Sequence, residues 1–145
     1  METLSAHSPV LAGTYPIGIS IPGSDLDIIC SYNDIDAFER TLDSEYADMK
    51  GYSMKRKFIR DRESVIARFL FDGFDFEIFG QSIPVNEQYA YRHMLIEDRL
   101  LRKHGTQFRK KILELKSKGL STEEAFAKIL GIKGDPYEEL LNFEL

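Results

Sequence analysis

The amino-acid sequence predicts an α+β fold, with a small mixed β-sheet first and helices afterwards. Two observations lead to this expectation. The segments SMKRKFIR, SVIARFLF and FDFEIF are rich in strand-forming residues, and Asp72-Gly73, which joins the last two, is typical of a two-residue hairpin turn. Beyond Pro84 the apolar residues recur with a helical period. We therefore expect a single domain over residues 1–145, with a sheet core at 1–84 and a helical part at 85–145.

The first half of the chain also contains two further strands and one helix. The apolar run PVLAG predicts a short strand, and a loop containing Gly and Pro follows from Thr14 to Ser24. DLDIIC (25–30) predicts the next strand. After it, an amphipathic helix is expected with Asn33 or Asp34 as its N-cap, because apolar residues recur there at helical spacing. They are Ile35, Phe38, Leu42 and Tyr46.

Capping signals divide the last third of the chain into short helices. Three glycines stand where the C-terminus of a helix favours a left-handed residue: Gly105, Gly119 and Gly131. Two segments have the pattern of a helix start: Ser121 followed by Glu124, and Asp135-Pro136 followed by Glu138. We therefore expect several helices joined by tight turns, which form a helical C-terminal cap.

Composition limits the class of protein. With 145 residues, of which 43% are hydrophobic and 30% charged, the chain can form one globular core. No apolar stretch is long enough to span a membrane and the N-terminus lacks the pattern of a signal peptide, so we expect a cytoplasmic protein with no membrane partner. The net charge of −5 argues against nonspecific binding of nucleic acid, although it allows local basic patches. The single cysteine, Cys30, excludes an intrachain disulfide and is expected to be buried.

The triplet Asp25-Leu26-Asp27 has the geometry of a metal site. On a strand, Asp25 and Asp27 project from one face with their Cα atoms about 7 Å apart. Two neighbouring carboxylates repel each other at neutral pH unless a cation lies between them, and Mg²⁺ or Mn²⁺ accepts such oxygen ligands. Two such ions about 4 Å apart can hold both the attacking and the leaving oxygen of a phosphoryl displacement. Taken alone, the pattern is also typical of a solvated strand face or an N-cap.

The glycines before this triplet fit a phosphate ligand. Gly13, Gly18 and Gly23 have no Cβ, so backbone amides near them can approach a polyphosphate closely. A loop of this composition alone is more often only a turn. Together with the carboxylates, however, it indicates nucleotide chemistry.

The pair Gly13-Thr14, followed about ten residues later by SDLDI, resembles the signature of the polymerase-beta-like nucleotidyltransferase superfamily. In that signature a Gly-Gly or Gly-Ser pair precedes an Asp-hydrophobic-Asp triplet. The resemblance implies that Gly13 and Thr14 contact a nucleoside triphosphate and that Asp25 and Asp27 hold magnesium. Ser24 matches the serine that often precedes the first carboxylate in small members. Thr14 departs from the usual Gly or Ser by keeping a hydroxyl and adding a methyl group.

Three longer segments resemble an uncharacterised family of small bacterial nucleotidyltransferase-like proteins: GTYPIGISIPGSDLDIIC, FEIFGQSIPVNEQYAYRHMLIE and LGIKGDPYEELL. This closer likeness covers nearly the whole chain and implies the minimal nucleotidyltransferase fold without implying a substrate. Superfamily members usually carry a full helix before the strand that leads to the Gly pair, whereas only a short segment precedes it here. We therefore expect a shorter first element or a truncated chain.

A third carboxylate is expected on a later strand. In FDFEIF, Asp75 and Glu77 alternate with apolar residues, so both lie on the face opposite the apolar one. We favour Glu77, which lies deeper in the strand, and expect the apolar face to pack under the helical cap. The pattern is equally compatible with a hairpin that has one solvated face.

Other candidates are weaker. His93 lies on an apolar helical stripe, where a histidine is more often a core residue than a catalytic base. The basic runs KRKFIRDR and RKHGTQFRKK could guide a triphosphate or a nucleic-acid acceptor, but they lack interleaved aromatics and more often form a solvated charged face.

The sequence therefore predicts a metal-dependent nucleotidyltransferase that transfers a nucleoside monophosphate from a nucleoside triphosphate to an acceptor hydroxyl. The expected metal ligands are Asp25, Asp27 and Glu77, which are also the catalytic residues, and the expected nucleotide-binding residues are Gly13, Thr14 and Ser24. Two alternatives stay open: a catalytically degenerate module that binds a nucleotide or a protein, and a metal-dependent phosphohydrolase. The acceptor is not specified, and nucleic acid is not indicated by the net charge.

Overall fold

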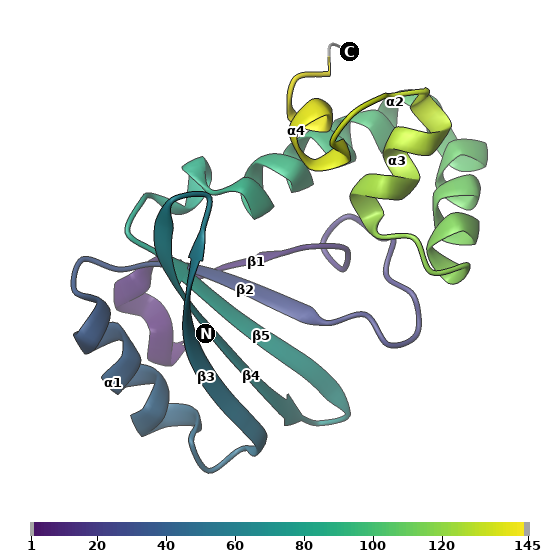
Figure 1. The fold of residues 1–145 in the computed structure, drawn as a ribbon. Coiled ribbons are helices and arrows are strands. Elements are labelled where there is room, and N and C mark those ends of the chain that lie inside the picture. Colours follow the sequence, from purple (N-terminus) through teal and green to yellow (C-terminus); the bar gives the residue numbers. More distant parts are fainter. Residues whose placement is uncertain (1, 144–145) are drawn as a thin grey trace. The chain divides into compact units, whose positions relative to one another are not determined.

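A five-stranded mixed sheet occupies the first part of the protein (Figure 1). We describe residues 2–143 of the chain from a computed structural model. The strands lie in the order β1-β2-β5-β4-β3, and only β2 and β5 run parallel to each other. A 3₁₀-helix, Glu2–His7, precedes β1. The strands are β1 (Val10–Ala12), β2 (Leu26–Ser31), β3 (Lys50–Ile59), β4 (Arg62–Phe71) and β5 (Phe74–Gln81).

The predicted hairpin between β4 and β5 is confirmed. Asp72 and Gly73 both have positive φ, at 51° and 81°, which is the conformation that a tight two-residue turn between antiparallel strands requires. The turn places Phe71 opposite Phe74 and sets the pairing of the rest of the hairpin. This register decides which side chains of β4 lie beside those of β5.

The core of the sheet lies against α1 (Ile35–Tyr46), as Figure 1 shows. Asp34 is the N-cap of α1, because its carboxylate accepts hydrogen bonds from the amides of residues 36 and 37. Phe38 and Leu42 are fully buried in one cluster with Ile28, Cys30 and Ile78 from the strands. The apolar face of β5 therefore packs with α1, and the expectation that it packs under the C-terminal helices is wrong. The reason is that α1 already supplies the apolar residues against which this face of β5 is buried.

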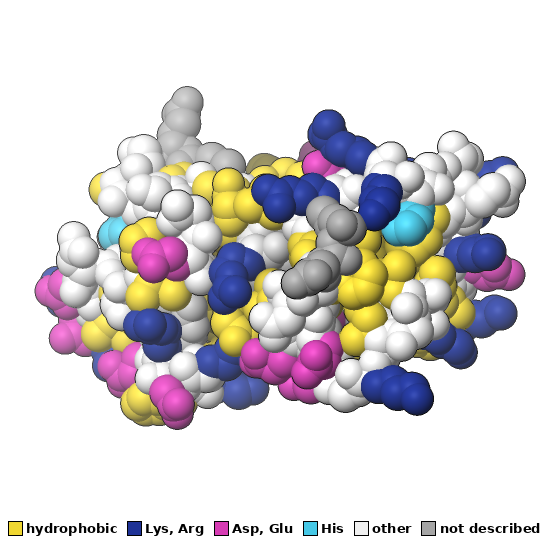
Figure 2. Space-filling view, turned by 90° about the horizontal axis from the view of Figure 1, so that it is seen from above, with side chains coloured by type: hydrophobic (Ala, Val, Ile, Leu, Met, Phe, Trp, Pro, Cys, Tyr) yellow, Lys and Arg dark blue, Asp and Glu magenta, His cyan; other side chains and the backbone are white. Residues whose placement is uncertain are grey.

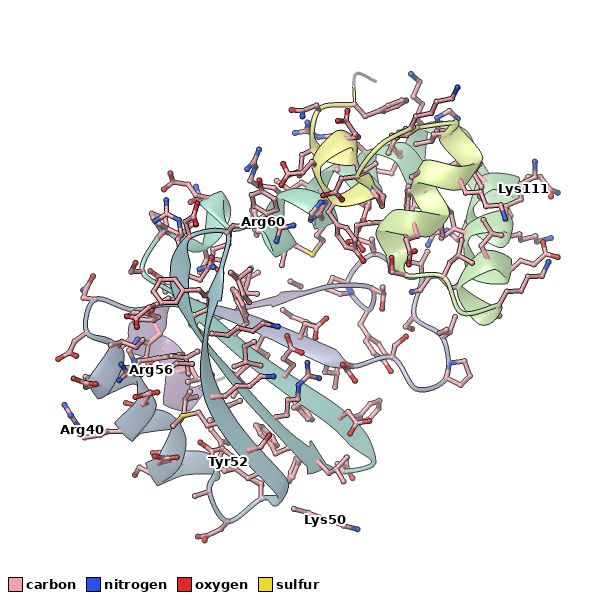
Figure 3. All side chains as sticks on the ribbon, in the orientation of Figure 1. Arg40, Lys50, Tyr52, Arg56, Arg60 and Lys111 are labelled. Atoms are coloured by element: carbon pink, nitrogen blue, oxygen red, sulfur yellow. The ribbon has the colours of Figure 1, made fainter. Side chains whose placement is uncertain are left out.

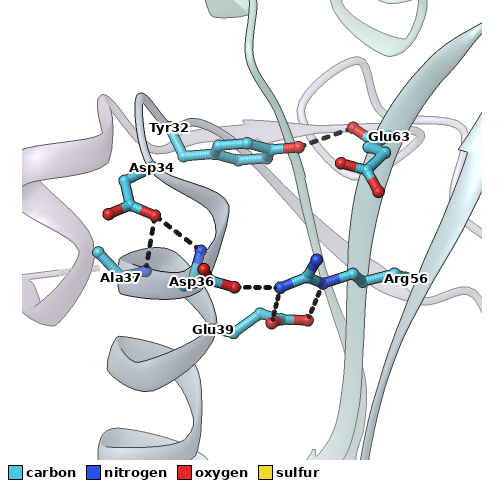
Figure 4. Close-up of polar contacts among 7 residues, drawn as sticks. All are labelled: Tyr32, Asp34, Asp36, Ala37, Glu39, Arg56 and Glu63. Carbon is cyan, nitrogen blue, oxygen red and sulfur yellow. Dashed lines mark hydrogen bonds and ion pairs between the residues drawn. The ribbon is translucent and has the colours of Figure 1, made fainter.

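Polar contacts hold α1 to β3 as well (Figure 4). The Arg56 guanidinium donates to both carboxylate oxygens of Glu39, at 2.9 and 2.6 Å, and it also pairs with Asp36. Nearby, the Tyr32 hydroxyl donates to the carbonyl oxygen of Glu63 at 2.7 Å. Arg56 thus belongs to the α1 side of the sheet.

The remaining elements are helical, as predicted. Gly105 interrupts α2 with φ 79° and ψ −162°, outside the helical region, so two helical stretches meet there. Ser121 and Glu124 form the predicted capping box of α3, and Gly131 ends α3 in the left-handed conformation. Asp135 caps α4, with Pro136 as its first residue. The elements are η2 (Val85–Glu87), α2 (Tyr89–Ser117), α3 (Thr122–Leu130) and α4 (Pro136–Leu141).

The chain divides into two compact units. The sheet unit consists of Met1–Ala12 and Gly23–Gln88, and the helical unit of Gly13–Pro22 and Tyr89–Leu145. Gly13–Pro22 joins the helices because Ile17 and Ile19 are buried among apolar residues of α2, α3 and α4. Each unit thus has a hydrophobic core of its own.

The surface carries charges of both signs. Figure 2 shows Lys and Arg side chains interspersed with Asp and Glu on the visible face, as expected for a chain that is 30% charged. Within residues 2–143, no helix combines the length and the apolar character that crossing a bilayer requires.

Candidate metal and nucleotide site

Parallel pairing of β2 with β5 brings the expected carboxylates together. Asp27 on β2 lies directly opposite Glu77 on β5, and Asp25 stands just before the first residue of β2. Directly paired residues of neighbouring strands share a face of the sheet, and residues two apart on one strand do so as well. Ile28 and Ile78, on the opposite face, are buried in the core with α1.

The three carboxylates converge. One oxygen each from Asp25, Asp27 and Glu77 lies within 4.8 Å of the other two, and no other group of three acidic, histidine or cysteine ligands occurs in residues 2–143. All three residues are partly exposed, so a ligand can reach them. Asp75 is more exposed than Glu77 and is not a member of the cluster.

This donor set fits a hard divalent cation. Carboxylate oxygens are the ligands that Mg²⁺ prefers, and in an octahedral shell the ligand oxygens lie about 3 to 4 Å apart. Oxygens within 4.8 Å of one another reach such a shell after small rotations of the side chains. Three carboxylates also leave coordination positions for substrate oxygens.

Arg68 on β4 supplies the positive charge beside this cluster. Its guanidinium lies 2.6 Å from a carboxylate oxygen of Glu77 and 3.6 Å from one of Asp25. Burial raises the pKa of Glu77, and Asp25 acts in the same direction, whereas Arg68 and Lys55 oppose that rise. Arg68 remains half-exposed, with 53% of its side chain accessible, so it is free to exchange partners.

Arg68 was not among the residues predicted from the sequence, although the sequence contains a signal for it. A two-residue turn at Asp72-Gly73 pairs residues outward from the turn, and counting along both strands places Arg68 opposite Glu77, as observed. An arginine in the otherwise apolar stretch VIARFLF, opposite a candidate metal ligand, is the feature that could have been found.

The expected nucleotide-binding residues fall in both units. Ser24 directly precedes Asp25 in the sheet unit, whereas Gly13 and Thr14 belong to the helical unit. Gly13 has a positive φ of 79°, a conformation that glycine adopts readily. The Thr14 carbonyl accepts a hydrogen bond from the amide of Ile19 at 3.1 Å, which closes the loop Gly13–Pro22 locally. Along the chain, Gly13 follows Ala12, which pairs with Asp27.

Two other residues have structural positions. Cys30 is fully buried, as predicted, and burial raises the pKa of its thiol to about 12, which makes it a poor nucleophile. His93 is also buried, and its Nε2 donates to the carbonyl oxygen of Tyr137 at 2.7 Å. His93 therefore ties α2 to α4, the structural role expected from its apolar stripe.

Comparison with known proteins gives a family match and a fold match. Residues 1–143 match the family described as "Domain of unknown function (DUF4269)". No curated protein matches the chain.

Several solved nucleotidyltransferase structures are similar to this chain. The Cid1 poly(U) polymerase with MgGTP bound is 18% identical, with a TM-score of 0.54 over 79% of this chain and 37% of that one. GLD-2 in complex with RNP-8 is 14% identical, with a TM-score of 0.57 over 89% of this chain and 50% of that one. A cytoplasmic RNA terminal U-transferase is 17% identical, with a TM-score of 0.53 over 91% of this chain and 38% of that one. The chain thus spans half or less of the length of these three proteins, and it has the predicted nucleotidyltransferase fold.

Proposed function

The chain belongs to the DUF4269 family and has a nucleotidyltransferase fold, and on this basis we propose that it is a metal-dependent nucleotidyltransferase. The reaction is transfer of a nucleoside monophosphate from a nucleoside triphosphate to an acceptor hydroxyl. The observation that carries this proposal is the convergence of Asp25, Asp27 and Glu77 across the β2–β5 pairing. A two-metal phosphoryl-transfer site needs carboxylates gathered at one place, and the pairing of Asp27 with Glu77 gathers them from two strands.

Each carboxylate has a specific role in the proposed site. Asp25 and Asp27 hold the divalent cations, Mg²⁺ or Mn²⁺, through their oxygens. Glu77 supplies the third carboxylate and accepts the proton of the attacking hydroxyl. When bound, the cations neutralise charge that develops on the phosphate oxygens.

The nucleotide is held by the segments that flank the first carboxylate. Gly13 and Thr14 provide backbone amides and a hydroxyl for the triphosphate, and Ser24 provides a second hydroxyl. The pairing of Ala12 with Asp27 supports this assignment, because the chain enters Gly13 from the strand position next to a metal ligand.

The proposed reaction is an in-line displacement. The acceptor oxygen forms a bond to the α-phosphorus while the bond from that phosphorus to the oxygen bridging to the β-phosphate breaks. Pyrophosphate leaves with the electron pair of the broken bond, and Glu77 takes the hydroxyl proton. Most of the rate enhancement would come from positioning and charge neutralisation.

A direct test combines metal binding with product analysis. The purified chain is heated with and without Mg²⁺ or Mn²⁺, and is then incubated with each α-labelled nucleoside triphosphate and a cell lysate as the source of acceptors. We expect a metal-dependent rise in thermal stability, since a ligand that binds only the folded state stabilises it, together with label on a new acceptor. Asp27→Asn should abolish both effects, and Asp75→Asn serves as the matched control.

The products separate the alternatives. Labelled free nucleoside monophosphate without transfer would indicate a phosphohydrolase. Nucleotide binding without any product would indicate a binding module, which the ion pair between Arg68 and Glu77 favours because it offsets part of the negative charge of the cluster without a metal. No metal effect on stability and no nucleotide binding would refute the proposed function.

A further inference from the structure

The basic run Lys55-Arg56-Lys57 of β3 divides between the two faces of the sheet. Successive strand residues point to opposite faces. Arg56 is committed to Glu39 and Asp36 of α1 (Figure 4). Lys55 and Lys57 therefore project from the other face, away from α1.

That other face is the one that carries the carboxylates. Ser53 pairs with Arg68, and Arg68 pairs with Glu77, so these three residues share a face. Lys55 and Lys57 are two and four residues further along β3 from Ser53 and lie on the same face. From the spacing of strands and residues, their Cα atoms are about 12 and 17 Å from that of Glu77. The four methylenes of each lysine let its ammonium group lie closer to the carboxylates than its Cα does.

The two lysines are available to a ligand. Both are exposed, and neither ammonium group has a hydrogen bond or ion pair in the described part of the chain. Arg68, half-exposed, lies between the lysines and the carboxylates.

The carboxylate cluster and the three basic side chains balance in charge only when no metal is bound. Asp25, Asp27 and Glu77 carry three negative charges, and Lys55, Lys57 and Arg68 carry three positive ones. Each divalent cation adds two positive charges, so metal binding makes the face strongly cationic and weakens the hold of the carboxylates on Arg68. A guanidinium released in this way is suited to phosphate, which it can bind through two parallel hydrogen bonds.

We propose that Arg68, Lys55 and Lys57 form a phosphate-binding row for the substrate, and that Arg68 moves from the carboxylates to that phosphate when a divalent cation binds. This proposal rests on the proposed function, because it concerns the same site. It assigns the row to phosphate groups, whether of the nucleotide's triphosphate or of a phosphate-bearing acceptor.

The first measurement follows metal binding alone. Mn²⁺ is titrated into the protein and the midpoint of stabilisation is read from thermal unfolding. Arg68→Met removes the cation that competes with the metal, so the midpoint concentration should fall about two- to fivefold, the scale of a partly exposed ion pair. Arg68→Lys, which keeps the charge, should stay near the parent value. Arg40→Gln, an exposed arginine on α1 at the opposite face, is the control (Figure 3).

The second measurement follows phosphate. Calorimetry with inorganic tripolyphosphate, in the presence of Mn²⁺, should show affinities reduced about three- to tenfold in Lys55→Gln, Lys57→Gln and Arg68→Met, and unchanged in Arg40→Gln. A short oligonucleotide without a terminal triphosphate forms the second arm. Loss of affinity for tripolyphosphate alone assigns the row to the nucleotide, and loss for the oligonucleotide alone assigns it to the acceptor.

The outcomes separate this inference from the proposed function. If Mn²⁺ binds the parent protein, but Arg68→Met leaves the midpoint unchanged and no row variant loses affinity for either phosphate ligand, the inference is overturned and the metal site stands. If Mn²⁺ does not bind while the row variants still lose phosphate affinity, the proposed function fails. The phosphate-binding row then stands, but the metal-induced movement of Arg68 to phosphate does not.

Discussion

Each of the two compact units holds a group of interacting charged side chains, and the two groups differ in exposure. In the sheet unit, the carboxylates of Asp25 and Glu77 are 38% and 21% exposed, and the Arg68 side chain that joins them is 53% exposed. In the helical unit, Glu97 and Lys116 are only 3% and 7% exposed. Charges that remain accessible can exchange partners with a ligand, whereas buried charges must be satisfied within the fold.

Charged side chains of α2 hold the loop Gly13–Pro22 in place. The Lys116 ammonium donates to the carbonyl oxygen of Ile19 at 2.6 Å, across 97 residues of sequence, and Arg109 donates to the carbonyls of Ile17 and Gly18. Burial raises the pKa of Glu97 well above its usual range and lowers that of Lys116. The same residue types therefore form a candidate site in one unit and attach Gly13–Pro22 to α2 in the other.

The largest effect is expected at the accessible charges. Glu77→Gln should keep the fold and one metal but reduce turnover at least about a hundredfold, the scale of losing a positioned base or ligand. The measurement is the rate of label transfer at saturating Mg²⁺, with circular dichroism to verify folding. Asp75→Asn, on the same strand but outside the cluster, should have far less effect. Equal losses in both variants would contradict the three-carboxylate site.

A smaller effect, on stability rather than turnover, is expected at a buried charge. Lys116→Met leaves the Ile19 carbonyl without its donor and removes the cation near Glu97, so we expect a loss of about 1 to 3 kcal/mol in unfolding free energy. Urea unfolding measures it. Lys111→Met, at an exposed position of the same helix (Figure 3), should change stability by less than about 0.5 kcal/mol. If Lys116→Met has the same unfolding free energy as the parent, the contact with Ile19 does not contribute to stability.

The smallest effect is a change in pH dependence. Burial, with Glu123 close by, raises the pKa of Glu97 in the folded protein, so the folded state keeps this proton after the unfolded chain has lost it. Stability therefore falls as pH rises above the usual carboxyl pKa of about 4.3, until the folded-state pKa is passed. Glu97→Gln should remove this pH dependence of the unfolding free energy. Relative to the parent, the variant should become more stable as pH rises above about 4.3, and it should gain no stability below that pH. Thermal unfolding from pH 4 to 8 measures the difference, and parallel profiles for both proteins would disprove it.

Much of the fold follows from local signals in the sequence. Asp34 caps α1, Ser121 and Glu124 form a capping box, and Asp72-Gly73 forms the hairpin turn, all as predicted. Each of these features depends on residues within four positions of one another, where side-chain and backbone preferences act directly. The period-two pattern also assigned Asp27 and Glu77 to polar faces of their strands.

The α+β class, the caps, the hairpin and the faces on which the carboxylates lie could all be predicted from the amino-acid sequence. Three arrangements emerge from the folded chain alone: β5 runs parallel beside β2 with Asp27 opposite Glu77, α1 covers the apolar face of the sheet, and Gly13–Pro22 joins the helical unit. These arrangements join segments far apart in the chain. They depend on which faces bury the most apolar surface together, and no short window of sequence contains that sum.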